Sequence, residues 1–209
     1  VLRSLGFKLT LSNKLLHTPK QLPENAVDLF KSNSVTTIGI SPFAQHIYKV
    51  YPLEKMEIVI SKLDALGYQL LIFGGGNEEK TIAENWASKF INVKNIIGKF
   101  TLAEELAIIS HVDVMLSMDS SGMHMASLMG IRVVSVWGAT HPYAGFLGYG
   151  HLYNDCIQFD KNNRPSSIYG NKPYSDEDPT GMENIEPNRI VEYIIEITNG
   201  KRTDHHPTC

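Results

Sequence analysis

The chain has 209 residues, 43% of them hydrophobic and 20% charged, which is the ordinary composition of a globular protein able to bury its own core. Its 19 basic and 22 acidic residues give a formal charge of -3, which excludes a basic excess directed at nucleic acid. No run approaches the ~18 apolar residues of a membrane-spanning helix. Two cysteines make no disulfide framework and fit a reducing cytoplasm.

The first residues lack both an initiator Met and a signal-peptide pattern, so we expect a part of a longer protein. Beyond a poorly periodic segment at 1–34, β-branched and apolar runs predict strands, and apolar residues at helical spacing predict helices. The predicted strands are 36–40, 69–73, 95–97, 112–116 and 132–136. The predicted helices are 52–66, 78–90, 101–109, 122–129 and 186–198. Residues 160–186 predict a long loop, and residues 201–209 predict a polar tail.

This alternation of strands and helices predicts a doubly wound α/β domain, Rossmann-like, with a parallel sheet over residues 35–200. The strands are continuous apolar runs, so helices should cover both faces of the sheet. Ligands of such sheets bind beyond the carboxyl ends of the strands. The loops expected to form a site are therefore 41–51, 74–79, 98–101, 118–124 and 137–145.

The loop 118–124 carries the strongest signal, because it leaves a predicted strand and opens a predicted helix. The small residues Ser120, Ser121 and Gly122 allow an anion to approach the free backbone N–H groups of that helix. The helix dipole favours an anion there by ~0.3–1 kcal/mol. The alternative is that Ser120 is only a helix N-cap.

Three further polar side chains are expected around this anion site. Asp119 would repel a phosphate, so we expect it to accept hydrogen bonds from backbone N–H groups or from sugar hydroxyls. Lys49 precedes a helix that begins at Pro52, at the mouth of the same crevice, and its compact charge suits a diphosphate. His124 lies one turn into its helix. The alternatives are an N-capping Asp119, a solvated Lys49 and a structural His124.

The glycine-rich loop 74–76 follows a strand and precedes a helix, but its G-x-G-x-x-G spacing is incomplete and no Gly-Lys-Ser/Thr follows. Glu78 is either a ribose-binding carboxylate or a solvated acid in the first turn of a helix. No H-x-x-x-H or H-E-x-x-H spacing indicates a metal site. The absence of Gly-x-Ser-x-Gly argues against a serine hydrolase.

Five segments in order complete the pattern. They are Ser41-Pro42-Phe43-Ala44 with Lys49-Val50-Tyr51-Pro52; Phe73-Gly74-Gly75 with Glu78; Gly98-Lys99-Phe100-Thr101-Leu102-Ala103-Glu104-Glu105-Leu106; Asp119-Ser120-Ser121-Gly122-Met123-His124-Met125-Ala126; and Trp137-Gly138-Ala139-Thr140-His141-Pro142. Together they resemble the carboxyl-terminal domain of family 9 glycosyltransferases, the heptosyltransferase family. Each motif alone is modest, but five in order are specific.

The resemblance implies one half of a two-domain GT-B type glycosyltransferase. It implies an inverting transfer from a nucleotide-diphospho-sugar, expected to be ADP-heptose, to a lipopolysaccharide core acceptor, without a cofactor or metal. The domains expected are 1–34 as the end of an amino-terminal domain and linker, 35–200 as the donor-binding domain, and 201–209 as a tail. The full-length protein would be cytoplasmic and would contact the inner face of the inner membrane.

The resemblance also assigns roles by position. No catalytic residue is expected in this chain, because the catalytic base belongs to the acceptor half. The donor-binding residues are Lys49 and the N–H groups of Ser120 and Ser121 for the diphosphate, with Gly122 beside them, His124 for the phosphate or sugar, Asp119 for the sugar, Glu78 for the ribose and Phe100 for the base.

Two departures and two alternatives accompany this interpretation. Ser121 stands where many relatives have Gly, and residues 163–167 lack the cysteines that relatives often carry there. The first alternative is another GT-B glycosyltransferase or a UDP-sugar epimerase-like domain, which would prefer uridine to adenine. The second is a non-catalytic nucleotide-binding module.

Overall fold

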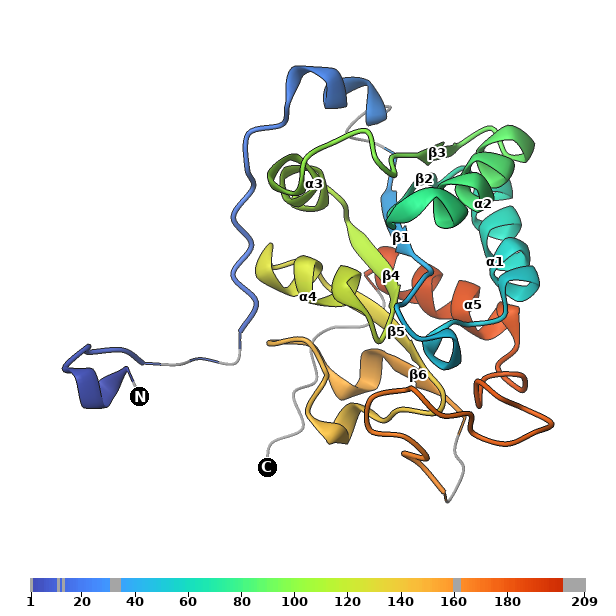
Figure 1. Cartoon of the computed structure of the whole chain (residues 1–209). Helices are drawn as coiled ribbons and strands as arrows, with labels where there is room; N and C mark the ends of the chain where they lie inside the picture. Colours follow the sequence, from blue (N-terminus) through green and yellow to red (C-terminus); the bar gives the residue numbers. More distant parts are fainter. Residues whose placement is uncertain (1, 11, 13, 31–34, 160–162, 201–209) are drawn as a thin grey trace.

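The computed structural model describes residues 2–10, 12, 14–30, 35–159 and 163–200. Within these ranges one sheet has the strands β1 (Thr37–Ser41), β2 (Gln69–Ile72), β3 (Val93–Asn95), β4 (Val114–Met118), β5 (Val133–Trp137) and β6 (Cys156–Gln158). Their order is β3-β2-β1-β4-β5-β6, and every neighbouring pair is parallel (Figure 1). The doubly wound α/β fold is therefore confirmed.

Helices cover both faces of this sheet (Figure 1). They are α1 (Leu53–Ala65), α2 (Gly76–Lys89), α3 (Leu102–Ile109), α4 (Ser121–Leu128) and α5 (Pro187–Thr198). One apolar cluster joins α1, α2 and α5 to the sheet, and a second joins α3 and α4 to its other face. In the described part of the chain, no helix is long and apolar enough to cross a membrane.

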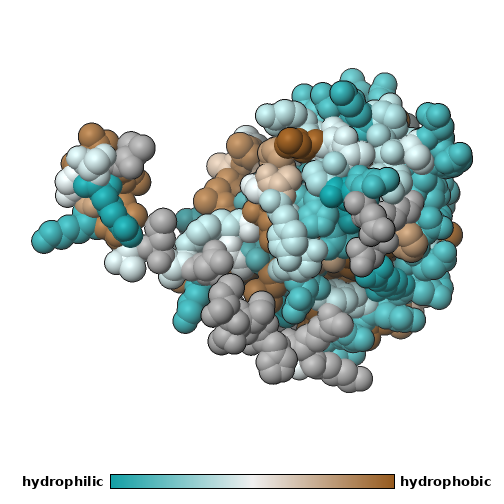
Figure 2. Space-filling view, turned by 90° about the horizontal axis from the view of Figure 1, so that it is seen from below, coloured by the Kyte–Doolittle hydropathy of each residue, from teal (hydrophilic) through white to brown (hydrophobic). Residues whose placement is uncertain are grey.

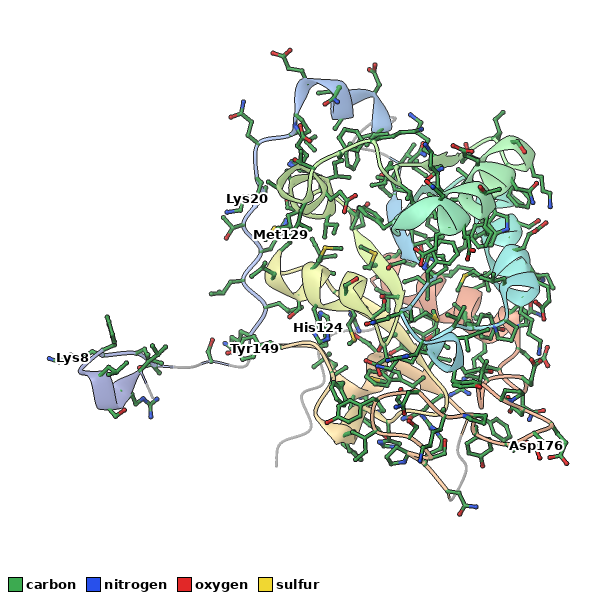
Figure 3. All side chains as sticks on the ribbon, viewed as in Figure 1. Lys8, Lys20, His124, Met129, Tyr149 and Asp176 are labelled. Carbon is green, nitrogen blue, oxygen red and sulfur yellow. The ribbon has the colours of Figure 1, made fainter. Side chains whose placement is uncertain are left out.

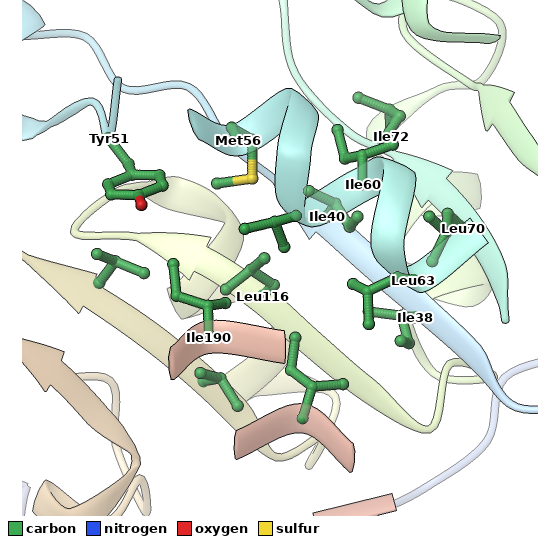
Figure 4. Packing of buried hydrophobic residues seen from close by; sticks show 14 of the residues in the cluster. Ile38, Ile40, Tyr51, Met56, Ile60, Leu63, Leu70, Ile72, Leu116 and Ile190 are labelled. Atoms are coloured by element: carbon green, nitrogen blue, oxygen red, sulfur yellow. The ribbon is translucent and has the colours of Figure 1, made fainter. Parts of the chain in front are cut away.

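The larger cluster explains why the strands are apolar along their whole length. Ile40 of β1 and Leu116 of β4 meet Met56 and Ile60 of α1 and Ile190 of α5, all of them fully buried (Figure 4). Burying one such side chain contributes about 1.5–3 kcal/mol. These contacts hold β1 and β4 side by side, with Ile40 opposite Leu116 in the register of the sheet.

The start of α3 shows how a local sequence signal fixes an element. The Thr101 hydroxyl accepts a hydrogen bond from the backbone N–H of Glu104, and the Glu104 carboxylate accepts one from the N–H of Thr101 at 2.7 Å. This is the predicted capping box, in which two N–H groups of the helix end are satisfied reciprocally. The helix therefore begins within one residue of the predicted position.

Other boundaries differ from the prediction. Strand β3 lies at 93–95 instead of 95–97, because Val93 pairs with Leu70. Strand β4 lies two residues later than predicted, and β6 was not predicted at all. Residues 163–186 contain no helix or strand, as predicted for this part of the loop. The predicted tail, 201–209, lies outside the described residues.

The amino-terminal residues 14–30 run along the surface formed by α3 and α4 (Figure 1). The His17 ring lies 2.8 Å from the carbonyl of Ser110, and the N–H of Lys20 donates to the Ser110 hydroxyl. Ala26 enters the second apolar cluster. Residues 2–10 project away from the body, and the projecting part carries apolar side chains (Figure 2). This segment is therefore docked from residue 14 onward.

Candidate functional site

A cavity of about 710 Å³ opens at the carboxyl ends of β1 and β4. The direction of winding reverses between these two strands. The sheet continues from β1 to β2 and β3 on one side, and from β4 to β5 and β6 on the other. Such a switch point is where loops diverge and leave a crevice. The polar side chains that line it come from β1, α2, α3, α4 and the loops between them. Six of them are Ser41, Lys49, Glu79, Asp119, Ser121 and His124.

The floor of the cavity is the amino-terminal end of α4. Ser120 is the N-cap residue in an extended conformation, yet its side chain makes no capping hydrogen bond to the helix. Its hydroxyl lies 3.4 Å from that of Ser117 instead. The first N–H groups of α4 are consequently not occupied by a side-chain cap, and they provide an anion-binding end with a favourable dipole.

Gly122 allows α4 to approach β1 at this point. A Cβ at position 122 would overlap the hydroxyl and the Cβ of Ser41 and would lie 3.2 Å from the hydroxyl of Ser117. The helix end therefore lies directly on the end of β1. Gly122 is itself buried and does not line the cavity, whereas its neighbour Ser121 does. Its contribution to the site is therefore this close approach of α4 to β1.

Lys49 and Asp119 form an ion pair in the cavity wall. Lys49 comes from the 3-10 turn at Ile47–Lys49, and its Nζ lies 2.9 Å from Oδ2 of Asp119. The two side chains are only 13% and 4% exposed. No hydrogen bond of ordinary geometry reaches Oδ2 from the described residues, so the ammonium is the group that neutralises it. Removing one partner would leave an uncompensated buried charge, which is costly.

His124 lies where two hollows meet. It lines the cavity above α4, and it also lines a smaller hollow of about 380 Å³ formed with Leu15, Leu16 and Tyr149. Figure 3 shows His124 close to Tyr149, which lies in the loop between β5 and β6. The imidazole is thus exposed and accessible from two sides, which suits a residue that contacts a ligand.

Besides Gly122, two predicted residues do not line the cavity. Glu78 is exposed, and Glu79 lines the cavity in its place, where its carboxylate accepts a hydrogen bond from the N–H of Gly75 at 2.7 Å. The reason is that α2 begins at Gly76, two residues before the predicted start, and each residue turns a helix by about 100°. Phe100 precedes α3, packs against the second apolar cluster and lines a separate hollow.

The cavity also contains residues that the sequence did not indicate. Phe146 and Tyr169 come from loops that follow β5 and β6, and their rings meet edge to face with centroids 6.1 Å apart. Leu102 and Met125 add apolar surface from α3 and α4. The two aromatic residues lie in segments without periodicity, so no local signal could identify them. Within the described ranges, no group of three or more His, Cys, Asp or Glu could hold a metal ion.

Glu105 of α3 is a second carboxylate in the cavity wall, and burial raises its pKa above the usual value. A raised folded pKa means that the carboxyl group destabilises the fold as pH rises through that pKa. We therefore expect Glu105→Gln to raise the free energy of unfolding at pH 7 by a few tenths of a kcal/mol, after screening by solvent. The gain should vanish near pH 4. Urea unfolding at pH 7 and pH 4 measures this gain, and Glu192→Gln, at an exposed glutamate, is the control. An equal gain in stability at both pH values would contradict the raised pKa of Glu105.

A family model described as glycosyltransferase family 9 (heptosyltransferase) matches residues 4–170. Lipopolysaccharide heptosyltransferase 3 of Escherichia coli is 29% identical over 106 residues, which are 49% of this chain and 31% of that protein.

Two solved structures share the fold. The structure of E. coli ADP-heptose lps heptosyltransferase II has a TM-score of 0.67 at 18% identity, and the match covers 92% of this chain and 57% of that protein. E. coli heptosyltransferase WaaC with ADP-2-deoxy-2-fluoro heptose has a TM-score of 0.61 at 17% identity, and the match covers 94% of this chain and 53% of that protein. The chain thus spans about a third of the curated relative and somewhat more than half of each solved one.

Proposed function

Because the chain belongs to glycosyltransferase family 9, we propose that its cavity binds the nucleotide-diphospho-sugar donor of an inverting sugar transfer. The observation that carries this proposal is the meeting of Lys49, Asp119 and the uncapped end of α4 in one cavity. The donor proposed is ADP-heptose and the acceptor a lipopolysaccharide core. A relative solved with an ADP-heptose analogue supports the choice of donor.

The diphosphate would lie between Lys49 and the first turn of α4. The ammonium supplies a full positive charge, and the N–H of Ser121 supplies a fixed donor, with the hydroxyls of Ser120 and Ser121 beside it. The N–H of Ser120, also predicted to bind the diphosphate, donates instead to the carbonyl of Met118 at 2.8 Å. As the glycosidic bond breaks, negative charge develops on the departing phosphate oxygen. One preorganised donor at such an oxygen is worth ~2.7–4 kcal/mol. His124 would contact the phosphate or the sugar, and Asp119 would accept a hydrogen bond from a sugar hydroxyl.

The nucleoside end is assigned to the opposite side of the cavity. Glu79 takes the ribose role in place of Glu78, since Glu79 lines the cavity and Glu78 does not. Leu102 and Met125 provide the apolar surface for the base, in place of Phe100. Carboxylates commonly accept hydrogen bonds from ribose hydroxyls in folds of this type. These assignments put the diphosphate between ribose and sugar, as the connectivity of the donor requires.

The acceptor and the catalytic base are assigned to the amino-terminal half of a two-domain GT-B enzyme. Residues 1–34 would be the end of that amino-terminal half and the linker, and the full-length enzyme would act in the cytoplasm at the inner face of the inner membrane. The chain alone would bind the donor and transfer little sugar. Measurable heptose transfer by these 209 residues would contradict this part of the proposal.

The decisive experiment is a calorimetric titration of the chain with ADP, UDP and GDP. We expect ADP to bind best, and Lys49→Ala to weaken ADP binding about tenfold, or ~1.4 kcal/mol, because a charge-assisted contact is lost. Lys62→Ala is the matched control, since Lys62 is an exposed lysine in the last turn of α1. The variant Lys49→Ala with Asp119→Asn removes the buried charge that the single change leaves behind.

The other outcomes separate the alternatives. A preference for UDP would favour another GT-B glycosyltransferase or an epimerase-like domain. Absence of nucleotide binding by a folded chain would contradict the proposal that this cavity binds the donor. Equal ADP affinities in the wild type and in Lys49→Ala would remove Lys49 from the site.

A further inference from the structure

The side chain of Lys49 is enclosed by two segments that lie about 100 residues further along the chain. Its Nζ lies 5.3 Å from the centroid of the Phe146 ring. The backbone of Gly170 lies against the stem, because an added Cβ there would lie 2.5 Å from both Cγ and Cε of Lys49 and 3.0 Å from Cδ. The whole aliphatic stem is therefore in contact with protein between its backbone and its charge.

Hydrogen bonds fix the segment that carries Tyr169 and Gly170. The hydroxyl of Ser167 donates to the side chain of Asn171 at 2.9 Å and accepts from the N–H of Asn171 at 3.1 Å, which closes the turn around Tyr169 and Gly170. The N–H of Ser166 donates to the carbonyl of Ala139 at 3.0 Å and ties this turn to the loop after β5.

Arg164 anchors the same region. Its guanidinium donates to the carbonyl of Thr140 at 2.8 Å, to that of Phe159 at 3.1 Å, and to that of Gly138. A planar fork with several fixed acceptors is rigid. The turn that places Gly170 against Lys49 is thus held by the loop that follows β5. The same loop carries Phe146.

We propose that Phe146, Tyr169 and Gly170 are positioning residues, a lysine clamp that holds the Lys49 ammonium in the diphosphate site before the donor arrives. Lysine has a flexible four-carbon stem, and ordering it on binding costs conformational entropy. The clamp removes that cost by fixing the stem in the unliganded protein. The Phe146 ring adds a cation–π attraction on the charge, and the Tyr169 ring supports Phe146 edge to face.

The clamp rests on the proposed function, because it prepares Lys49 for a diphosphate. The Lys49–Asp119 ion pair alone would pull the ammonium toward Asp119 and away from an incoming anion. The Phe146 ring, with its centroid 5.3 Å from Nζ, attracts the same charge and gives the ammonium a second partner besides Asp119. With its stem held against Gly170, Lys49 lines the cavity and can meet the diphosphate without a rearrangement of that stem.

Calorimetry with ADP on the whole chain tests the clamp. Phe146→Leu should weaken ADP binding about fivefold, by loss of the cation–π contact and of the ordered stem. Because the ring acts through Lys49, the same substitution should have no effect in a Lys49→Ala background. Tyr143→Leu is the matched control, since Tyr143 is an exposed aromatic on the same loop that stacks on Tyr153 instead. Equal losses in both backgrounds would overturn the clamp.

A second readout does not depend on nucleotide binding. In protein with isotope-labelled lysine, the Cε and Hε resonances of Lys49 should be displaced by the ring current of Phe146, and this displacement should disappear in Phe146→Leu and persist in Tyr143→Leu. Unchanged resonances in Phe146→Leu would overturn the clamp. If ADP fails to bind the wild type while the resonances behave as expected, the proposed function fails, and only the contact of Phe146 with Lys49 stands. Tyr169→Leu, at a residue that is 64% exposed, replaces Phe146→Leu if that variant does not fold.

Discussion

Replacing Gly122 with alanine is expected to lower the free energy of unfolding by about 2 kcal/mol, because the added methyl group has no space. It would overlap Ser41 at both its hydroxyl and its Cβ. The Cβ of Ser41 cannot rotate away, so either β1 or the end of α4 must move. The better helix propensity of alanine offsets part of this cost, by about 0.5–1 kcal/mol. Urea unfolding of the two proteins measures the difference.

The same substitution should weaken ADP binding by roughly tenfold or more, since a small displacement of the α4 end misaligns several donors at once. Gly75→Ala is the matched control for stability, because a Cβ at position 75 meets nothing within 4 Å. The change Ser41→Gly removes the atoms that clash and should restore stability to Gly122→Ala. A double variant as unstable as Gly122→Ala alone would show that the close approach to Ser41 is not the cause.

These expectations depend on a site whose polar half was predictable from the sequence. Lys49 follows one strand and Asp119 follows another, and parallel strands end at the same edge of a sheet. Local periodicity therefore sufficed to bring Lys49, Asp119, Ser120, Ser121 and His124 to one crevice. The ion pair itself was not predictable, because sequence spacing does not tell how far a lysine reaches.

The aromatic half of the site was not predictable, for a physical reason. Phe146 and Tyr169 lie in irregular segments, whose course is fixed by hydrogen bonds from Arg164 to carbonyl groups far away in sequence. Strand β6 was missed because its residues, Cys156–Gln158, are too few to show a period. The interchange of Glu78 and Glu79 shows how an error of two residues at a helix start changes the face that a side chain occupies.

The largest expected pH effect concerns His151, in the loop between β5 and β6. Burial lowers its pKa from 6.5 to about 4, and the nearby His124 acts in the same direction, whereas the backbone of Ile131 and the carboxylate of Asp155 oppose it. Both ring nitrogens are shielded from solvent, and neither makes a hydrogen bond of ordinary geometry to the described residues. The folded protein therefore holds this imidazole neutral where an unfolded chain would protonate it.

The sign of the effect follows from this difference. Above pH 6.5 His151 is neutral in the folded and in the unfolded chain, so its burial costs no stability. Between pH 6.5 and 4 the unfolded chain takes up a proton that the folded chain refuses, so the fold loses up to about 3 kcal/mol as pH falls. The change His151→Gln should remove this part of the pH dependence, and His111→Gln, at an exposed histidine, serves as the control.

Urea unfolding at pH 7.5, 5.5 and 4.5 measures the slope in all three proteins. The wild type and His111→Gln should lose stability more steeply than His151→Gln over this range. Parallel slopes for all three proteins would mean that His151 is protonated in the fold at the same pH as in the unfolded chain.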